Sequence, residues 1–323
     1  MSADAEVAAA LAAVRAASEL CAGAQGRLAD GDTLTKGDES PVTVADFAAQ
    51  AVVCGTLTDA LGAIDLVGEE DSDDLRADAR RSLLDSVVDL VRRQRGDDVS
   101  AANVLDWIRA GSADGSTDRY WTLDPIDGTK GFLRGDQYAI ALALIDDGEV
   151  RLGVLGCPNL PNPDGSTGAV FLATEGRCDA WFGSSTDPLP MRVAAPATIT
   201  EARLCESVES AHSNQSDSAR IAELLGITAE PYRIDSQCKY AAVARGDASI
   251  YLRLPTRADY REKIWDHAAG KYVVEQAGGR VTDITGAPLD FRHGTRLENN
   301  RGVVATDGRF HDEVVAAISA AGI

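Results

Sequence analysis

The sequence is short of basic side chains and has no grouped cysteines. Its 323 residues include 31 Lys and Arg against 51 Asp and Glu, a formal net charge of −20, which repels phosphodiester polymers and anionic lipid heads. The six cysteines form no CxxC or other metal-ligand spacing, so we expect buried, reduced thiols. There is no unbroken run of 18 apolar residues, and the first twenty residues do not resemble a signal or transit peptide. We therefore expect a cytoplasmic protein that binds neither nucleic acid polymers nor membranes.

The composition is that of an ordinary folded protein. Apolar residues make up 45% and charged residues 25% of the chain, which excludes a disordered or collagen-like protein. The length is roughly twice the ~150 residues typical of one domain, so two packed domains or one large domain are both open. An acidic protein of this kind can still bind a small phosphate ester if metal ions or a few local Arg and Lys side chains reverse the field at one site.

The first half of the chain predicts helices followed by β-hairpins. Apolar periodicity indicates helices at 3–26, at 46–61 and twice between 74 and 110. Strands are expected at 65–68, 120–123, 138–145, 150–157, 169–174 and 178–182, with hairpin turns at 146–149 and 175–176. The Gly-, Ser- and Pro-rich segment 183–191 is the best linker candidate. It predicts an N-terminal α+β domain over 1–187 and a C-terminal α/β domain over 188–323.

The second half alternates strands and helices. Strands are expected at 203–208, 232–234, 249–254 and 302–306. Helices are expected at 217–225, 236–245, 266–277 and 309–321, and Gly278-Gly279 is a typical helix stop. This alternation describes an α/β half that follows an α+β half.

One passage, Asp124-Pro125-Ile126-Asp127-Gly128, carries the clearest chemical signal. Two carboxylates three residues apart follow a strand, Pro125 is expected to fix a turn between them, and Gly128 lets the backbone approach a ligand. Such a turn can aim both carboxylates and the Ile126 carbonyl at one point. Ligation by oxygen alone suits a hard cation such as Mg²⁺. An Asp-Pro/Asp-Gly surface turn is the alternative interpretation.

Two further acidic features support the metal hypothesis. The acidic run 69–71 ends a predicted strand, and Asp266 starts a predicted helix between Trp265 and His267. Taken alone, the first could be a solvated charge run and the second a helix N-cap. If these carboxylates converge, each pair of charges ~4 Å apart costs about 4 kcal/mol at an effective dielectric near 20. Only bound cations would make such a cluster tolerable.

Together these residues resemble the 3'(2'),5'-bisphosphate nucleotidases, a branch of the inositol monophosphatase superfamily of Mg²⁺-dependent, lithium-sensitive phosphatases. The superfamily signature is matched by Glu69-Glu70, Asp124-Pro125-Ile126-Asp127-Gly128-Thr129 and Trp265-Asp266. The nucleotidase branch is matched by Ser40-Pro41-Val42-Thr43, Lys130-Gly131-Phe132-Leu133-Arg134-Gly135, Gly156-Cys157-Pro158-Asn159-Leu160, Asp235-Ser236-Gln237, Tyr251-Leu252-Arg253-Leu254-Pro255 and Glu262-Lys263-Ile264-Trp265-Asp266-His267-Ala268-Ala269-Gly270. The blocks run in order from about residue 36 to 306.

The resemblance implies a fold and a reaction. The fold is the layered αβαβα sandwich of the inositol monophosphatase and sugar-phosphatase type, an α/β (α+β) class, with the metal site in the cleft between the halves. The reaction is hydrolysis of the 3'-phosphate of adenosine 3',5'-bisphosphate (PAP) to AMP and phosphate, with the 5'-phosphosulfate analogue as a further possible substrate. The resemblance further implies two or three Mg²⁺ ions, inhibition by Li⁺ and Na⁺, a link to sulfur assimilation and salt tolerance, and a monomer.

The resemblance also assigns roles to individual residues. The metal ligands it implies are Glu69, Asp124, the Ile126 carbonyl, Asp127 and Asp266. Asp46 and Thr129 match the pair that orients and deprotonates the attacking water. The positions that match substrate contacts are Thr129, His212, Ser236, Lys239, Arg253 and Asp266. Without the resemblance, His212 reads as a surface or capping histidine, Lys239 as a solvated helix residue and Arg253 as half of a strand-end ion pair.

Two alternatives remain open at this point. An inositol phosphate or fructose bisphosphate phosphatase would use the same metals on another ester. A catalytically silent regulator that binds a metal or nucleotide belongs to a different class, and the intact Asp46, Glu69, Asp127 and Thr129 argue against it.

Overall fold

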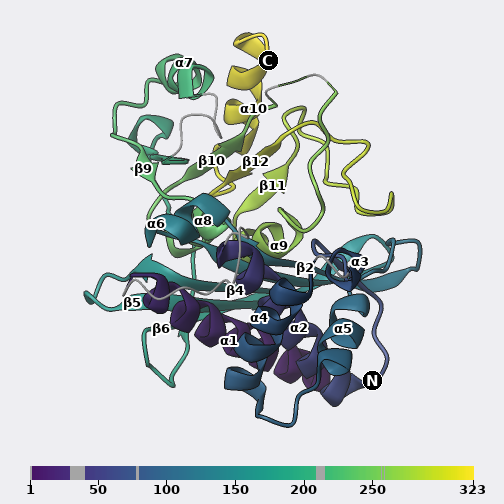
Figure 1. The fold of residues 1–323 in the computed structure, drawn as a ribbon. Coiled ribbons are helices and arrows are strands. Elements are labelled where there is room, and N and C mark those ends of the chain that lie inside the picture. Colours follow the sequence, from purple (N-terminus) through teal and green to yellow (C-terminus); the bar gives the residue numbers. More distant parts are fainter. Residues whose placement is uncertain (1, 30–40, 78–79, 209–214, 256, 258) are drawn as a thin grey trace.

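Five layers of alternating helices and sheets make up the molecule (Figure 1). The computed structural model describes residues 2–29, 41–77, 80–208, 215–255, 257 and 259–323. A seven-stranded sheet and a five-stranded sheet lie one above the other, with helices outside each sheet and between them. The expected αβαβα sandwich is therefore confirmed.

The first sheet is built from seven strands in chain order. They are β1 (Leu66–Gly68), β2 (Arg119–Asp127), β3 (Ala139–Asp146), β4 (Glu149–Pro161), β5 (Thr167–Thr174), β6 (Arg177–Phe182) and β7 (Leu189–Pro190). β1 runs parallel to β2, and all other neighbours are antiparallel. Both predicted hairpins are confirmed. The prediction of a linker at 183–191 was partly wrong, because β7 lies inside this segment and pairs with β6. The sequence did not reveal β7, because a strand of two residues is too short to show alternation.

Helices cover the outer face of this sheet. α1 (Ala3–Ala29) packs against β3 and β4, and α2 (Pro41–Leu61) packs against α1 and β2. Three shorter helices extend this layer: α3 (Asp73–Arg76), α4 (Arg81–Arg95) and α5 (Ala101–Arg109). α1 approaches the sheet closely because its inner face carries small side chains such as Ala13 and Ala17, both fully buried.

Two of these helices are long and apolar enough to cross a bilayer by length and composition alone, over 3–28 and 43–61. Their sequences still contain charged residues, which is why no unbroken apolar run of 18 occurs in the chain. In the fold both helices contribute side chains to one buried cluster with strands of the first sheet. Packing against the sheet accounts for their apolar character, as in the core helices of other folded proteins.

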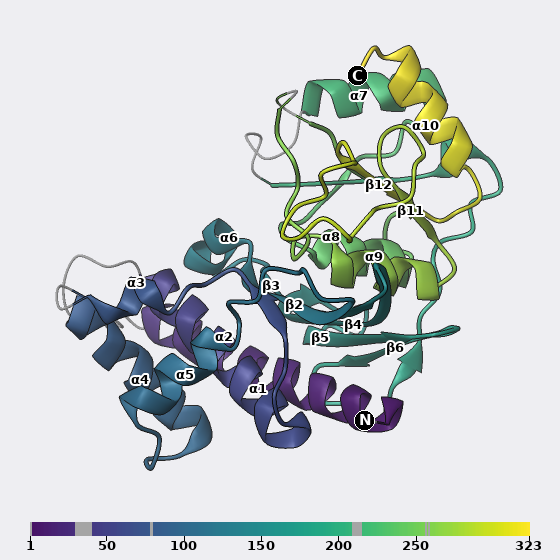
Figure 2. The same cartoon turned by 90° about the vertical axis from the view of Figure 1, so that its right-hand side faces the viewer.

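The second sheet has the strand order β11-β12-β10-β8-β9. Its strands are β8 (Leu204–Glu206), β9 (Tyr232–Arg233), β10 (Ile250–Arg253), β11 (Arg280–Thr282) and β12 (Val303–Thr306). α8 (Cys238–Arg245) and α9 (Ala268–Gln276) lie between the two sheets, whereas α7 (Gln215–Leu225) and α10 (His311–Ala320) cover the far face (Figure 2). The alternation of strands and helices expected for this half is confirmed. The sequence did not predict β11, which has only three residues.

The two sheets share one hydrophobic core. A single cluster of buried side chains joins Leu155 and Phe171 of the first sheet to Tyr240 of α8, Val273 of α9 and Ala305 of the second sheet. Burial on both faces explains why β3 is almost entirely apolar rather than alternating. The domain division at 187/188 stays a prediction.

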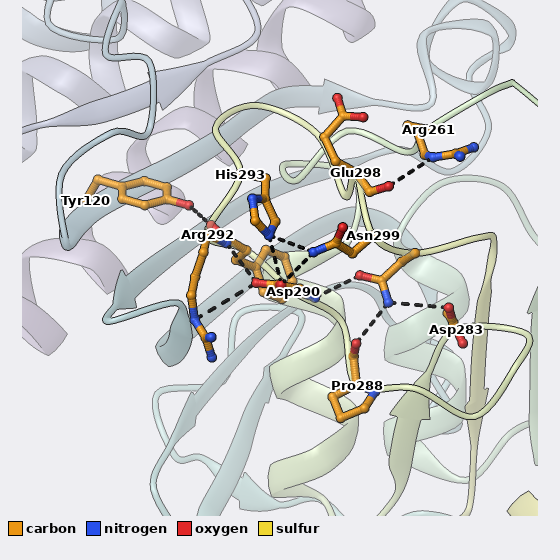
Figure 3. A network of polar contacts seen from close by, with 11 residues as sticks. Tyr120, Arg261, Asp283, Pro288, Asp290, Arg292, His293, Glu298 and Asn299 are labelled. Carbon is orange, nitrogen blue, oxygen red and sulfur yellow. Dashed lines mark hydrogen bonds and ion pairs between the residues drawn. The ribbon is translucent and has the colours of Figure 1, made fainter.

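A long loop, residues 283–302, joins β11 to β12 and is held by polar contacts (Figure 3). The Asp290 carboxylate accepts hydrogen bonds from His293 Nε2 at 3.0 Å and Asn299 Nδ2 at 3.1 Å. The Tyr120 hydroxyl of β2 donates to the Phe291 carbonyl at 2.6 Å. The loop is therefore anchored to the first sheet as well as the second.

The same loop supports the chain just before Asp266. The backbone N–H of Ile264 donates to the Thr295 carbonyl at 3.2 Å, and the N–H of Leu297 donates to the Glu262 carbonyl at 2.9 Å. These contacts fix the backbone that leads into α9, so the position of Asp266 depends on residues 30 places later in the sequence.

One buried histidine, His311, makes a contribution to stability that should be lost in acid. His311 is 1% exposed, and its two ring nitrogens pair with the hydroxyls of Thr282 and Thr306 at 2.8 and 2.9 Å. Burial, assisted by the charge of Arg280, lowers the pKa of His311 to about 4. The unfolded chain therefore takes up a proton first, and stability falls on the order of 2 kcal/mol as pH drops from 6.5 to 4.

Thermal melts from pH 7 to pH 4 check this prediction. The melting temperature of the wild type should fall more steeply than that of His311→Gln, in which the titrating group is gone. Parallel pH profiles for the two proteins would contradict it.

Candidate active site

Asp124 and Asp127 lie at the end of β2, within the strand rather than after it. The predicted turn was wrong, because β2 continues to Asp127 and pairs Asp124 with Ala141 and Asp127 with Ala139. One extra residue on β2 therefore forms a bulge. In a regular strand, residues three apart point to opposite faces, and a one-residue bulge returns them to the same face. Pro125 fits here because a bulge leaves its missing N–H without a required partner.

Glu69 is delivered to the same place by the parallel pairing of β1 and β2. Gly68 is opposite Leu123, so the next residues along, Glu69 and Asp124, emerge together from neighbouring strand ends. The fully buried Gln50 of α2 fixes this exit: its amide donates to the Glu70 carbonyl at 2.6 Å and accepts from the Glu70 N–H at 3.0 Å.

The carboxylates are close enough to raise the pKa values of one another. Burial and the negative charges of Glu69, Asp127, Asp266 and Asp46 hold the pKa of Asp124 well above its usual range. The pKa of Asp266 is likewise raised, by burial and by the charges of Asp127 and Glu69. The four residues predicted as ligands through their side chains thus lie within one electrostatic cluster, with Asp46 beside it.

Asp46, on α2, has its own acidic neighbours. Burial, and then the charges of Glu70 and Glu69, raise the pKa of Asp46. Burial and the charge of Glu69 raise the pKa of Glu70 to about 7. α2 also contacts α6 (Thr129–Arg134), the helix that starts at Thr129. The predicted catalytic pair therefore comes from two helices in contact.

The oxygen atoms of this cluster are suitable ligands for a hard divalent cation. Asp124 is 2% exposed, and its Oδ1 atom is buried with no hydrogen-bond partner, a costly arrangement unless a ligand satisfies it. Glu69, Asp124, Asp127 and Asp266 offer only carboxylate oxygens, as Mg²⁺ prefers. Ile126 is buried at 2% exposure beside them, and the role of its carbonyl stays a prediction.

Another set of possible ligand atoms, from Glu262, Asp266 and His267, also lies within 4.8 Å of one another. Two of these side chains already have partners. The Glu262 carboxylate pairs with Arg253 Nε at 3.2 Å and with His267 Nε2 at 3.3 Å. A cation on Glu262 would meet the Arg253 guanidinium, so we assign Asp266 to the carboxylate cluster and Glu262 to Arg253.

A cavity of about 430 Å³ opens beside the carboxylates. Its walls include the metal-ligand candidates Asp127 and Asp266. They also include four of the predicted substrate residues, Thr129, Ser236, Lys239 and Arg253. A larger groove of about 850 Å³ runs along α1, β4 and α9, and it contains none of the predicted site residues. His212 lies outside the described residues.

Two residues of the cavity wall, Gly128 and Ser236, have unusual backbone conformations. Gly128 has φ +93°, and a side chain there would come within 2.8 Å of the Ser236 Cβ atom. Ser236 itself has φ +63°, a left-handed conformation that is uncommon outside glycine. The turn at Ser236 aims the Gln237 N–H at Asp127 Oδ2, 2.5 Å away. Asp127 is thereby fixed by the opposite half of the molecule.

Two cations face the cavity. Lys239 is only 6% exposed, and its Nζ lies 5.3 Å from the centre of the Tyr251 ring. Burial lowers the pKa of Lys239, while the charge of Asp127 opposes that shift. Arg253, at the end of β10, is the second cation. Lys239 is therefore not a solvated helix residue, and Arg253 is more than half of a strand-end ion pair. Both side chains line the same cavity.

The site also contains polar residues to which the sequence assigned no role. Tyr240, Glu262 and His267 are buried and connected: the Tyr240 hydroxyl is 2.7 Å from His267 Nδ1, and His267 continues to Glu262. Glu262 and His267 stand in the motif around Asp266, and their spacing of five residues gave no sign that both would meet Arg253.

An acidic cluster suited to a divalent cation, set against a small cavity with Lys and Arg in its wall, defines a class of protein: a metal-dependent hydrolase of small phosphate esters. The family model described as the inositol monophosphatase family matches residues 3–322. This chain therefore belongs to the inositol monophosphatase family, whose members are metal-dependent phosphatases.

Curated relatives with similar sequences are 3'(2'),5'-bisphosphate nucleotidases. A 3'(2'),5'-bisphosphate nucleotidase of Oryza sativa is 44% identical over 97% of this chain and 93% of its own length. Proteins with the same name from Emericella nidulans and Dictyostelium discoideum are 42% and 41% identical, over 88% and 96% of this chain and 90% and 95% of their own lengths.

Solved structures agree on the fold. CysQ from Bacteroides thetaiotaomicron has a TM-score of 0.62 at 19% identity, covering 93% of this chain and 96% of its own. An IMPase of Thermotoga maritima has a TM-score of 0.61 at 21% identity, covering 97% and 96%. This chain therefore shares its fold with both solved structures despite low sequence identity.

Proposed function

We propose that this protein hydrolyses the 3'-phosphate of adenosine 3',5'-bisphosphate to give AMP and phosphate. The observation that carries the proposal is the meeting, in one cavity, of an acidic cluster with Lys239 and Arg253. The relatives named 3'(2'),5'-bisphosphate nucleotidase, at 41–44% identity over most of the chain, support the choice of a nucleotide.

In this proposal Glu69, Asp124, Asp127 and Asp266 hold two or three Mg²⁺ ions. When bound, such ions neutralise the phosphate oxygens and make a bound water easier to ionise. Asp46 accepts the proton of the attacking water. Burial and the charges of Glu70 and Glu69 raise the pKa of Asp46, which makes it a stronger base than a free carboxylate. The Thr129 hydroxyl, on the cavity wall, orients that water.

The other wall binds the substrate. Lys239 supplies a point charge and Arg253 a planar guanidinium, which together suit the phosphates of a nucleotide. Ser236 and Gln237 form a turn on the same cavity wall, and the Gln237 N–H donates to Asp127 Oδ2. We further propose inhibition by Li⁺ and Na⁺, and a monomer in the cytoplasm acting in sulfur assimilation and salt tolerance.

A phosphate-release assay tests the substrate. Purified protein is given Mg²⁺ and one of four esters: adenosine 3',5'-bisphosphate, inositol 1-phosphate, inositol 1,4-bisphosphate or fructose 1,6-bisphosphate, each with and without LiCl. We expect the adenosine bisphosphate to have the highest kcat/KM. Preference for an inositol or sugar ester would overturn the substrate, and tight nucleotide binding without turnover of any ester would support a silent regulator.

Replacing Arg253 tests the substrate wall. Arg253→Ala should raise KM for adenosine 3',5'-bisphosphate ~10-fold or more while leaving kcat within about threefold, because the lost contact binds ground state and transition state alike. Steady-state kinetics at saturating Mg²⁺ measure both constants. An unchanged KM would remove Arg253 from the binding site.

A further inference from the structure

Glu262 is a buried acid in direct contact with the substrate wall. Its side chain is 4% exposed, whereas that of its partner Arg253 is 31% exposed. Arg253 Nε lies 3.2 and 3.3 Å from the two carboxylate oxygens of Glu262. The Glu262 carbonyl accepts from the Leu297 N–H, so the loop between β11 and β12 holds its backbone. The backbone of Glu262 is thus held by the loop, while its carboxylate binds Arg253.

A chain of hydrogen bonds reaches Glu262 from the layer between the sheets. An ionised carboxylate only accepts, so His267 Nε2 is the donor to Glu262 across 3.3 Å. With the ring proton on Nε2, Nδ1 accepts the hydrogen bond that the Tyr240 hydroxyl donates across 2.7 Å. Hydrogen bonds from His267, together with the charge of Arg253, lower the pKa of Glu262 despite its burial. Glu262 is therefore a satisfied, charged acceptor.

We propose that Glu262 is a positioning residue for substrate binding, which holds the Arg253 guanidinium on the substrate wall and away from the metal-binding carboxylates. This inference rests on the proposed function of the cavity. Glu262 does not line the cavity, whereas Arg253 and His267, its two partners, both do. Glu262 therefore acts on the substrate through other side chains.

The charges around Arg253 explain why a positioning anion is needed. Lys239, Arg253, Asp127 and Asp266 line one cavity. The charge of Lys239 repels that of Arg253, and the charges of Asp266 and Asp127 attract it. Without the Glu262 carboxylate, the guanidinium would turn toward Asp266 and compete with the cation there. The contact with Glu262 keeps the two positive groups in separate places.

A double-mutant cycle tests the proposal on the ester that the wild type hydrolyses best in the four-substrate assay. Glu262→Gln keeps the side-chain shape and removes the charge. We expect KM to rise about 10-fold with kcat within about threefold. In the Arg253→Ala background the same change should raise KM less than twofold, because the side chain that Glu262 positions is already gone. Glu262→Asp, which restores the charge, should recover part of the lost affinity.

The controls separate positioning from folding. Glu275→Gln removes the charge of a half-buried glutamate that pairs with Lys271 outside the cavity. This control variant should leave KM unchanged. Equal increases in KM from Glu262→Gln with and without Arg253 would overturn the proposal, as would a loss confined to kcat and melting temperature. Failure of the proposed function is seen separately, because the wild type would then prefer another ester, on which the cycle still reports the coupling. If no ester is turned over, the same cycle is measured on the Kd for adenosine 3',5'-bisphosphate.

Discussion

Asp127→Asn should reduce kcat by ~10² or more with little change in fold. Asp127 lies where the β2 bulge, the Gln237 N–H and the cavity meet. The amide oxygen of Asn can still accept from Gln237, so the local structure is retained. The substitution removes one negative charge from the carboxylates proposed to hold the cation, so the electrostatic stabilisation of the transition state should fall with it.

Kinetics with a matched control measure this effect. Asp147→Asn changes the same chemistry at an exposed turn where Asn also tolerates the positive φ of 52°. It should leave kcat and the melting temperature unchanged. If Asp127→Asn retained near-normal turnover at every Mg²⁺ concentration, Asp127 would not be a ligand. A kcat that recovered fully at high Mg²⁺ would mean that the residue contributes affinity only.

Local patterns were enough to predict most of the fold. Apolar periodicity located the helices and strands of both halves because each element buries one continuous stripe or run, as in α1 and β3. Two short helices, α3 and α6, were missed. The strands missed were β7 and β11, which are too short for a pattern. Their strand conformation comes from pairing with longer neighbours, β6 and β12, which no local pattern encodes.

The candidate site was predictable in part. Family motifs pointed to Asp124 and Asp127, and the structure brings both to one cluster, but by a bulge and not by the expected turn. A bulge depends on the register with β3, which lies outside the motif itself. The contact of Glu262 with Arg253 was hidden for a similar reason: it needs the end of β10, the start of α9 and the loop 283–302 to meet in three dimensions.

Removing divalent cations should abolish activity and also change how stability depends on pH. In the part of the chain that the structure describes, positive charges that act on the carboxylate cluster include those of Lys239, Arg253 and Lys263. Treatment with EDTA should lower phosphate release by more than ~10²-fold, and Mg²⁺ should restore it while Na⁺ should not. Full activity after exhaustive chelation would contradict the assignment of the cluster as a metal site.

The pH dependence follows from the raised pKa values. Glu70 titrates near 7 in the fold and near 4.5 when unfolded, and the pKa values of Asp46, Asp124 and Asp266 are raised as well. The stability that these protonated groups contribute is fully present below the unfolded pKa and is lost as pH rises through the folded pKa. The melting temperature of the EDTA-treated protein should therefore fall between pH 6 and pH 8.

Saturating Mg²⁺ should reverse that trend, because a bound cation favours the ionised carboxylates and releases their protons. At 100 times its dissociation constant a ligand adds about 2.7 kcal/mol, and the gain should be larger at pH 8 than at pH 6. Melts of wild type and Asp127→Asn, each with and without Mg²⁺, measure it; the variant should gain less from Mg²⁺. An equal Mg²⁺ effect in both proteins at both pH values would place the cation away from this cluster.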